Sequence, residues 1–341
     1  MRRREFITLV GGGIVACPLG ARAQQPAMPL IGLLMVGTAE TDAFRVASVL
    51  KGLNELGYVE GRNLAIEYRW AEGRYDRLPA LAADLVRREV AVIVAMTTNS
   101  ALAAKAAAGT IPIVFMIGGD PVKFGLVASL NRPGGNVTGV SFLSDLLVSK
   151  ELEILGEVVP KALSIGLLVN PSNANVDLDV REAQTTANAL GRQLVVARAA
   201  AESDLDSTFA TLVQRQIGGF AVDPDPLLNS WRDQLITLAA RHTLPAVYPL
   251  REFVIAGGLM AYGTSLTDGF RQAGVYAARI LRGEKPSELP VMQSTKVELV
   301  INLKTAKAAW SHCTASAAWP RRRSDRITRV LLHRRWSLVG T

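Results

Sequence analysis

Short apolar runs rich in β-branched residues alternate with segments of helical period along most of this chain. In the N-terminal third, the runs predict strands at 30–36, 64–68, 91–96 and 111–117. Between them, apolar residues spaced three to four positions apart predict helices at 42–56, 75–88 and 97–108. A regular alternation of strand and helix is typical of a parallel sheet with helices on both faces.

The stretch 111–142 marks the passage from one such unit to the next. Its strand at 111–117 stops at Gly118-Gly119-Asp120-Pro121, a short helix is expected at 122–130, and a second strand at 137–142 leads onward. A strand that ends in two glycines leaves bare backbone at its carboxyl end, where open α/β sheets bind ligands.

The second half of the chain repeats the pattern. Strands are expected at 164–169, 193–197, 219–222, 245–248, 258–262 and 296–302, and helices at 145–158, 180–190, 204–214, 227–241 and 267–281. We therefore predict an α/β fold of two Rossmann-like lobes with parallel sheets. Lobe 1 would span 28–140 and be completed by about 262–303, and lobe 2 would span 141–261. Three crossings near 140, 260 and 295 would form the hinge.

Composition and charge narrow the class of protein. With 49% hydrophobic and 20% charged residues, the chain of 341 residues is globular and long enough for two domains. The net charge of +8 lies at its ends, because residues 1–23 contribute +3 and residues 310–341 contribute +6. The body between them is close to neutral and gives no electrostatic reason to expect a nucleic-acid partner.

Residues 1–23 have the order of an export signal, which predicts a periplasmic protein. Arg2 to Arg4 form a basic start, 6–19 is apolar, and Ala21-Arg22-Ala23 is a small-x-small cleavage site. Arg3-Arg4-Glu5-Phe6-Ile7 also resembles the twin-arginine export motif. Two alternatives are a lipoprotein box ending at Cys17 and an ordinary N-terminal helix of a cytoplasmic protein.

We expect the signal to be removed after Ala23, because that residue completes the small-x-small site. Mass analysis of the exported protein should then find Gln24 as its first residue. A lipid-modified Cys17 at the mature N-terminus would contradict this prediction and would tether the protein to the membrane.

The last segment, 310–341, breaks the pattern. It contains three of the five tryptophans and seven arginines. We expect it to be disordered, or to result from a frameshift near residue 309. A basic arm for nucleic acid or anionic lipid is the functional alternative.

Several segments resemble one family. The sequence DPVKFGLVASLNRPGGNVTGVS, from Asp120 to Ser141, is similar to the signature of ABC-transporter substrate-binding proteins with the type I periplasmic fold. GLNELGYVEGRNLAIEYRWAEG and VELVINLKTAKA also match, and the resemblance covers 30–308. It implies a small organic solute, an amino acid or related carboxylate, delivered to an ABC permease in the inner membrane. No cofactor is implied, and we expect a monomer.

The candidate ligand-binding residues share a place near strand ends that would face the cleft between the lobes. They are Gly37, Thr38, Thr97, Thr98, Asn99, Ser100, Gly119 and Asp120 from lobe 1, Asn173, Asn175 and Asp225 from lobe 2, and Tyr262 near the hinge. Hydroxyls and first-turn amides at 97–100 would hold a carboxylate, and Asp225 would pair with an ammonium group. Each residue alone is equally typical of a helix cap or a turn.

Other functions receive less support from the sequence. His242 is the one histidine in the body, and the chain has no G-x-S-x-G or H-E-x-x-H motif. We therefore expect neither an enzyme nor a metal site. A two-domain enzyme would need a carboxylate pair such as Asp120 and Asp225 facing each other across the cleft. An exported ligand sensor that signals to a receptor is the other alternative.

Overall fold

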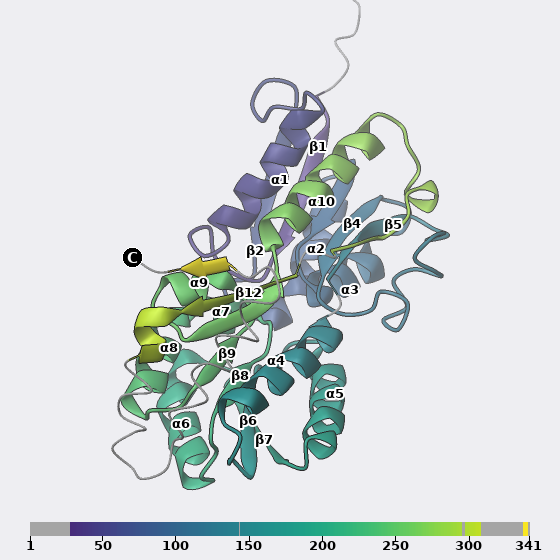
Figure 1. Cartoon of the computed structure of the whole chain (residues 1–341). Coiled ribbons are helices and arrows are strands. Elements are labelled where there is room, and N and C mark those ends of the chain that lie inside the picture. The colour runs from purple at the N-terminus through teal and green to yellow at the C-terminus, as the bar shows by residue number, and fades with distance from the viewer. Residues whose placement is uncertain (1–27, 143, 295–296, 308–336, 340–341) are drawn as a thin grey trace, which may run out of the picture.

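Two lobes, each built on one β-sheet, make up the part of the chain that the computed structural model describes (Figure 1). The described residues are 28–142, 144–294, 297–307 and 337–339. The expected signal sequence at 1–23, both cysteines and most of the tail at 310–341 lie outside them. Within the described residues, no helix is both long and apolar enough to cross a bilayer.

The first sheet has six strands, all paired in parallel. In spatial order they are β11 (Met292–Gln293), β5 (Val137–Ser141), β4 (Ile113–Ile117), β3 (Val92–Ala95), β1 (Leu30–Met35) and β2 (Ala65–Trp70). Strands β1, β3, β4 and β5 are buried almost throughout, as expected for a parallel sheet covered on both faces.

Four helices cover this sheet, two on each face. They are α1 (Ala43–Glu55) and α10 (Leu266–Leu281) on one face, and α2 (Leu78–Arg87) and α3 (Thr98–Ala107) on the other. Helices α1 and α10 lie against each other with their backbones almost in contact (Figure 1). A Cβ added at Gly52 would lie 1.9 Å from the Arg271 carbonyl oxygen, so only glycine allows this approach.

The second sheet has seven strands. In spatial order they are β13 (Ser337–Val339), β12 (Val297–Asn302), β10 (Met260–Thr264), β9 (Ala246–Tyr248), β8 (Phe220–Val222), β6 (Ser164–Val169) and β7 (Gln193–Arg198). Helices α4 (Ser144–Val158) and α5 (Val176–Ala189) cover one face, and α6 (Leu205–Gln214), α7 (Pro226–Ser230), α8 (Arg232–Arg241) and α9 (Arg251–Ile255) cover the other. Three short 3₁₀ turns complete the elements, at Tyr75–Arg77, Glu202–Asp204 and Pro286–Glu288.

The chain crosses between the lobes three times, which confirms the predicted hinge. The crossings follow β5, β10 and β11. The expected boundary needs one change, because β12 pairs antiparallel with β10 and so belongs to the second sheet. The part that returns to lobe 1 is therefore α10 through β11, and the range 262–303 was too long.

Three local expectations differ from the structure. Residues 122–130 form turns and not a helix, since Gly125 has a φ of +64° that interrupts any helical run. The expected helix at 227–241 is divided into α7 and α8 at Trp231. In the tail, β13 pairs in parallel with β12, so these three residues depart from the expected disorder.

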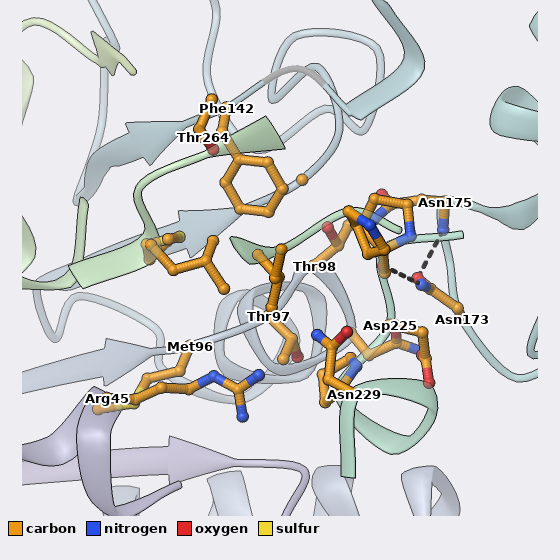
Figure 2. Close-up of a pocket in the computed structure, with 18 of the residues that line it drawn as sticks. Arg45, Met96, Thr97, Thr98, Phe142, Asn173, Asn175, Asp225, Asn229 and Thr264 are labelled. Carbon is orange, nitrogen blue, oxygen red and sulfur yellow. Dashed lines mark hydrogen bonds between the residues drawn. The ribbon is translucent and has the colours of Figure 1, made fainter. Parts of the chain in front are cut away.

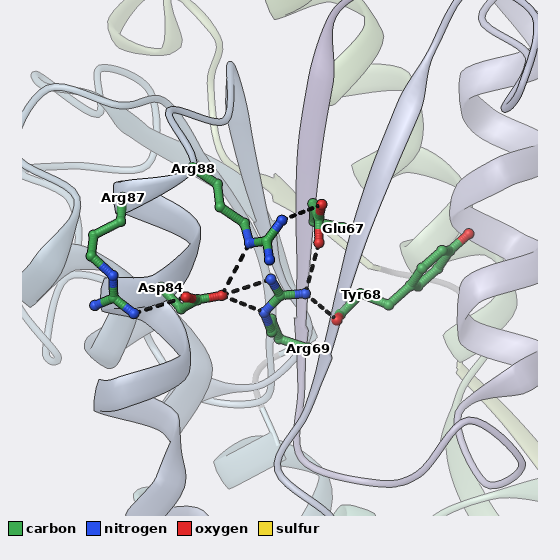
Figure 3. A network of polar contacts seen from close by, with 6 residues as sticks. All are labelled: Glu67, Tyr68, Arg69, Asp84, Arg87 and Arg88. Atoms are coloured by element: carbon green, nitrogen blue, oxygen red, sulfur yellow. Dashed lines mark hydrogen bonds and ion pairs between the residues drawn. The ribbon is translucent and has the colours of Figure 1, made fainter.

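A network of charged side chains ties the edge strand β2 to α2 (Figure 3). Arg69 donates to Glu67 and to Asp84, and Arg88, the residue after α2, donates to the same two carboxylates. Hydrogen bonds from Arg69 lower the pKa of Asp84, so the carboxylate stays ionised. Charged groups along an edge strand also disfavour pairing with another chain.

Candidate functional site

A pocket lies between the two lobes, where the carboxyl ends of their strands meet (Figure 2). Both lobes and two of the three crossings contribute to its wall. The lining residues are Arg45, Tyr75, Met96, Thr97, Thr98, Asn99, Met116, Gly118, Phe142, Leu147, Asn173, Asn175, Pro224, Asp225, Pro226, Asn229, Pro249, Leu250, Thr264, Leu266 and Phe270. This is the position at which doubly wound α/β sheets bind ligands.

The start of α3 forms the polar wall on lobe 1. Thr97 is its N-cap, and the Thr97 Oγ1 accepts a hydrogen bond from the Ser100 amide at 3.0 Å and lies 2.8 Å from the Ser100 hydroxyl. Thr98 is 2% exposed, and its hydroxyl has no hydrogen-bond partner among the described residues. The amides of Thr98 and Asn99 have no partner inside the helix, so this end of α3 offers several donors.

The turn after β6 forms the facing wall on lobe 2. The Asn170 side chain accepts from the Ser172 amide, and the Asn173 side chain accepts from the Asn175 amide, so the turn is held by its own side chains. Asn175 is 5% exposed, and its Oδ1 has no partner among the described residues. In α7, Asn229 likewise has a buried Oδ1 that has no hydrogen-bond partner among the described residues.

Asp225 has a buried carboxylate that joins the two lobes. Its Oδ1 accepts from the amides of Leu227 and Leu228 at 2.9 and 3.1 Å and from the Asn170 side chain at 3.1 Å. Its Oδ2 accepts from the Tyr75 hydroxyl of lobe 1 at 2.5 Å. Burial raises the pKa of Asp225, and the bond from Tyr75 is the largest effect that opposes the rise.

Arg45 brings a buried positive charge to the pocket from α1. It forms an ion pair with Asp42, and its guanidinium carbon lies 5.9 Å from the centre of the Phe270 ring. The pocket also has an apolar part, made by Met96, Met116, Phe142, Leu147, Leu250, Leu266 and Phe270. Polar groups at one part of a largely apolar wall are typical of sites for small organic molecules.

Half of the candidates from the sequence line this pocket: Thr97, Thr98, Asn99, Asn173, Asn175 and Asp225. The other six, which lie outside the lining, are Gly37, Thr38, Ser100, Gly119, Asp120 and Tyr262. Two of these make local turns, since the Gly37 amide donates to Asp42 and Asp120 accepts from the Val122 amide. Tyr262 packs beside the core between the second sheet and α4 and α5.

The sequence reasoning missed several lining residues. Tyr75 follows β2, whose carboxyl end lies at the same edge as the ends of β1 and β3, so the strand-end rule could have found it. Leu266 and Phe270 belong to α10, which follows the second crossing, and the sequence predicted a helix there at 267–281. Arg45 and Asn229 lie within helices, and no local signal distinguishes them from surface positions.

The lining offers little for catalysis or metal binding. It contains no histidine, cysteine or lysine, and Asp225 is its one carboxylate. Across the residues that the structure describes, no group of three or more His, Cys, Asp or Glu residues is placed to hold a metal ion. The carboxylate pair that a two-domain enzyme would need is not formed by Asp120, which caps its own turn.

Comparisons with known proteins agree with this architecture. The model of the ABC transporter substrate binding protein family matches residues 38–310. A tyrosine-binding protein of Clostridioides difficile (strain R20291) is 30% identical over 259 residues, which cover 76% of this chain and 74% of that protein.

Solved structures show the same fold. A conserved domain protein of Vibrio cholerae has a TM-score of 0.77 and 28% identity, covering 88% of this chain and 98% of its own. A Streptococcus pneumoniae ABC domain in complex with L-Trp has a TM-score of 0.74 and 24% identity, covering 82% and 94%. From the family match and the two-lobed fold, we conclude that the chain belongs to the ABC transporter substrate-binding protein family.

Proposed function

We propose that this protein is the periplasmic solute-binding subunit of an ABC importer, and that its solute is an amino acid with an apolar, above all aromatic, side chain. One observation carries the proposal. The buried hydroxyl of Thr98 and the buried Oδ1 atoms of Asn175 and Asn229 line one pocket without partners among the described residues. Buried polar groups are nearly always hydrogen-bonded, so these atoms fit the polar head of a solute.

The carboxylate of the solute would bind at the start of α3. The Thr98 hydroxyl and the free first-turn amides donate hydrogen bonds there, and the helix dipole favours a negative charge. Arg45 adds a full positive charge to the same pocket. Because Asp42 already balances this charge, we assign Arg45 a supporting role at the carboxylate.

The ammonium group would be bound from lobe 2. Asn175 and Asn229 each offer an unused amide oxygen, and the Asp225 carboxylate supplies the opposite charge. Among the described residues, the Oδ2 atom of Asp225 accepts one hydrogen bond, from Tyr75, so it can accept a second. The sequence-based prediction that Asp225 meets the ammonium group therefore remains, with helix capping as an additional role of the same side chain.

The side chain of the solute would lie in the apolar part of the pocket, against Phe142 and Phe270 among others. Aromatic rings prefer edge-to-face or offset contacts with other rings, which these residues offer. The tyrosine-binding relative supports an aromatic amino acid, since it is 30% identical over three quarters of both chains. The tryptophan complex with the same fold is consistent with it.

A thermal-shift screen of the protein from Gln24 onward tests this proposal. L-Tyrosine, L-tryptophan, L-phenylalanine and L-leucine should raise the melting temperature, because a solute at about 100 times its Kd stabilises the folded state by about 2.7 kcal/mol. D-Ribose, L-aspartate and L-lysine serve as controls that lack the apolar side chain. Stabilisation by ribose or aspartate alone would refute the proposed solute class.

Delivery to a permease is the second half of the proposed function. Closure of the lobes around the solute would create the surface that the permease recognises. Cells that lack this protein should lose high-affinity uptake of the labelled amino acid and regain it with the wild-type gene. Normal uptake together with a lost response to the amino acid would favour the ligand-sensor alternative.

A further inference from the structure

One side chain, Asn99, joins the two lobes by two hydrogen bonds at a partly exposed edge of the pocket. Its Nδ2 donates to the carbonyl oxygen of Ser172, and its Oδ1 accepts from the amide of Ala174, both at 2.9 Å. The two ends of the amide are thus both satisfied by the main chain of the other lobe. This pairing resembles the way in which a neighbouring strand is bound in a sheet.

Both sides of this contact are held rigidly within their own lobes. Asn99 lies in the first turn of α3, which the Thr97 side chain caps. The partner turn is fixed by the Asn170 side chain, which accepts from the Ser172 amide at 3.0 Å. The Asn173 side chain also donates to the Pro224 carbonyl oxygen, which ties the turn to the end of β8. The contact can therefore form only at one relative position of the lobes.

Pocket contacts and lobe contacts alternate along both segments. On lobe 1, Thr98 offers its unpartnered hydroxyl to the pocket, while the next residue, Asn99, binds the other lobe. On lobe 2, Asn175 lines the pocket, while Ser172 and Ala174 bind Asn99. A solute held between Thr98 and Asn175 therefore requires the same relative position of the lobes as the Asn99 contact.

Gly119, on lobe 1, lies close to Asn175 of lobe 2, and its lack of a side chain permits this approach of the two lobes. A Cβ added there would lie 2.7 Å from the Asn175 Oδ1 and 2.3 Å from the Phe124 ring. The missing side chain thus leaves room for Asn175 to approach lobe 1.

We propose that Asn99 is a closure latch, by which we mean a positioning residue whose two hydrogen bonds hold the lobes together around the solute and slow its dissociation. The inference rests on the proposed amino-acid-binding function. Hydrogen bonds that exist only in the closed arrangement shift the equilibrium toward that arrangement. Since water competes at this partly exposed edge, we expect their loss to speed solute release about tenfold.

The test uses protein from Gln24 onward with Cys313→Ser and a dye pair at Arg62→Cys and Leu163→Cys, two exposed positions on different lobes. Stopped-flow energy transfer with L-tyrosine and L-tryptophan reports closing and release. Asn99→Ala should release solute about tenfold faster, with an association rate within about twofold of wild type. The matched control is Asn136→Ala, since the Asn136 side-chain Nδ2 donates to main-chain oxygens within lobe 1, at Gly109 and Ile111.

Asn99→Asp separates a latch from a helix-start residue. The aspartate keeps the acceptor for Ala174, loses the donor to Ser172 and places a negative charge at the start of α3, which favours the helix. Because this charge would also repel a solute carboxylate at the start of α3, release is compared with that of Asn99→Ser, a neutral variant whose side chain is too short for both cross-lobe hydrogen bonds. A latch predicts faster release in both variants, with an unchanged or higher melting temperature for Asn99→Asp. A purely structural role predicts wild-type release.

The outcomes distinguish the latch from the proposed function. Wild-type release rates in both Asn99→Ala and Asn99→Asp would overturn the latch, even if both amino acids bind. If neither amino acid changes the energy transfer of wild type, the proposed solute class fails. The latch is then tested by the solute-free proteins, where Asn99→Ala should show lower mean energy transfer, and an equal value would overturn it.

Discussion

Replacing Asp225 by alanine should lower the free energy of unfolding by about 3–5 kcal/mol. The substitution removes the acceptor for four donors: the amides of Leu227 and Leu228, the Asn170 side chain and the Tyr75 hydroxyl. All four bonds end at a residue that is fully buried, so water cannot replace the carboxylate without cost. The variant should also bind its amino acid about ten- to a hundredfold more weakly.

Two further variants separate the causes of this loss. Asp225→Asn keeps an acceptor for the α7 amides, so it should retain most of the stability while losing the charge that meets the ammonium group. Tyr75→Phe removes only the bond between the lobes. Urea unfolding and calorimetric titration of the three variants measure both effects. A stability loss below about 1 kcal/mol in Asp225→Ala would contradict the structural role assigned to this residue.

The second large effect concerns carboxyl groups buried inside lobe 2, behind the pocket. Glu151 from α4, Asp179 from α5 and Asp223 after β8 are all fully or almost fully buried. Burial raises the pKa of Glu151 and Asp223 well above their usual values, and the neighbouring Asp179 raises both further. The negative charge of Asp225 also raises the pKa of Asp223.

The sign of the pH effect follows from these raised pKa values. The folded protein holds protons on these groups that the unfolded chain releases near pH 4, so their contribution to stability is fully present below that pH. This contribution is lost as the pH rises through the pKa values that the two groups have in the folded protein. Glu151→Gln and Asp223→Asn should therefore each be more stable than wild type at pH 7.5, because neither variant has to keep a buried carboxyl group protonated at that pH.

Urea unfolding between pH 4 and pH 8 checks this prediction. The difference between each variant and wild type should be smallest at pH 4 and should grow with pH. Asp204→Asn is a matched control, because that carboxylate is only partly buried and accepts from the local amides of Ala200 and Ala201. A stability difference that does not change with pH would show that the buried groups are not protonated in the fold.

Much of the fold could be predicted because its elements are set by local patterns. Buried parallel strands such as β1 and β4 have runs of apolar residues that no loop or amphipathic helix shares. The positions of glycine and proline residues predicted most ends of helices and strands correctly. The strand β12 was assigned to the wrong lobe, since only its antiparallel hydrogen bonds to β10 decide its sheet, and no local pattern encodes them.

The candidate site was predictable only where one rule applied. Residues in the turns and helix starts that follow buried strands, such as Thr98 and Asn175, were found because their backbone position places them at the sheet edge. The same rule selected Gly37 and Asp120, whose groups are used in local turns. Arg45 and Phe270 reach the pocket from helices, and only the packing of α1 against α10 brings them to one wall.

Calorimetric titration of wild type and Thr98→Val with L-tyrosine and L-tryptophan tests the central claim most directly. Valine has nearly the shape of threonine but lacks the hydroxyl that has no partner among the described residues, so the variant should unfold like wild type. We expect wild type to bind these amino acids at one site per chain, and Thr98→Val to bind them about ten- to a hundredfold more weakly. No saturable binding by wild type, or equal affinities of the two proteins, would contradict an amino-acid site at the start of α3.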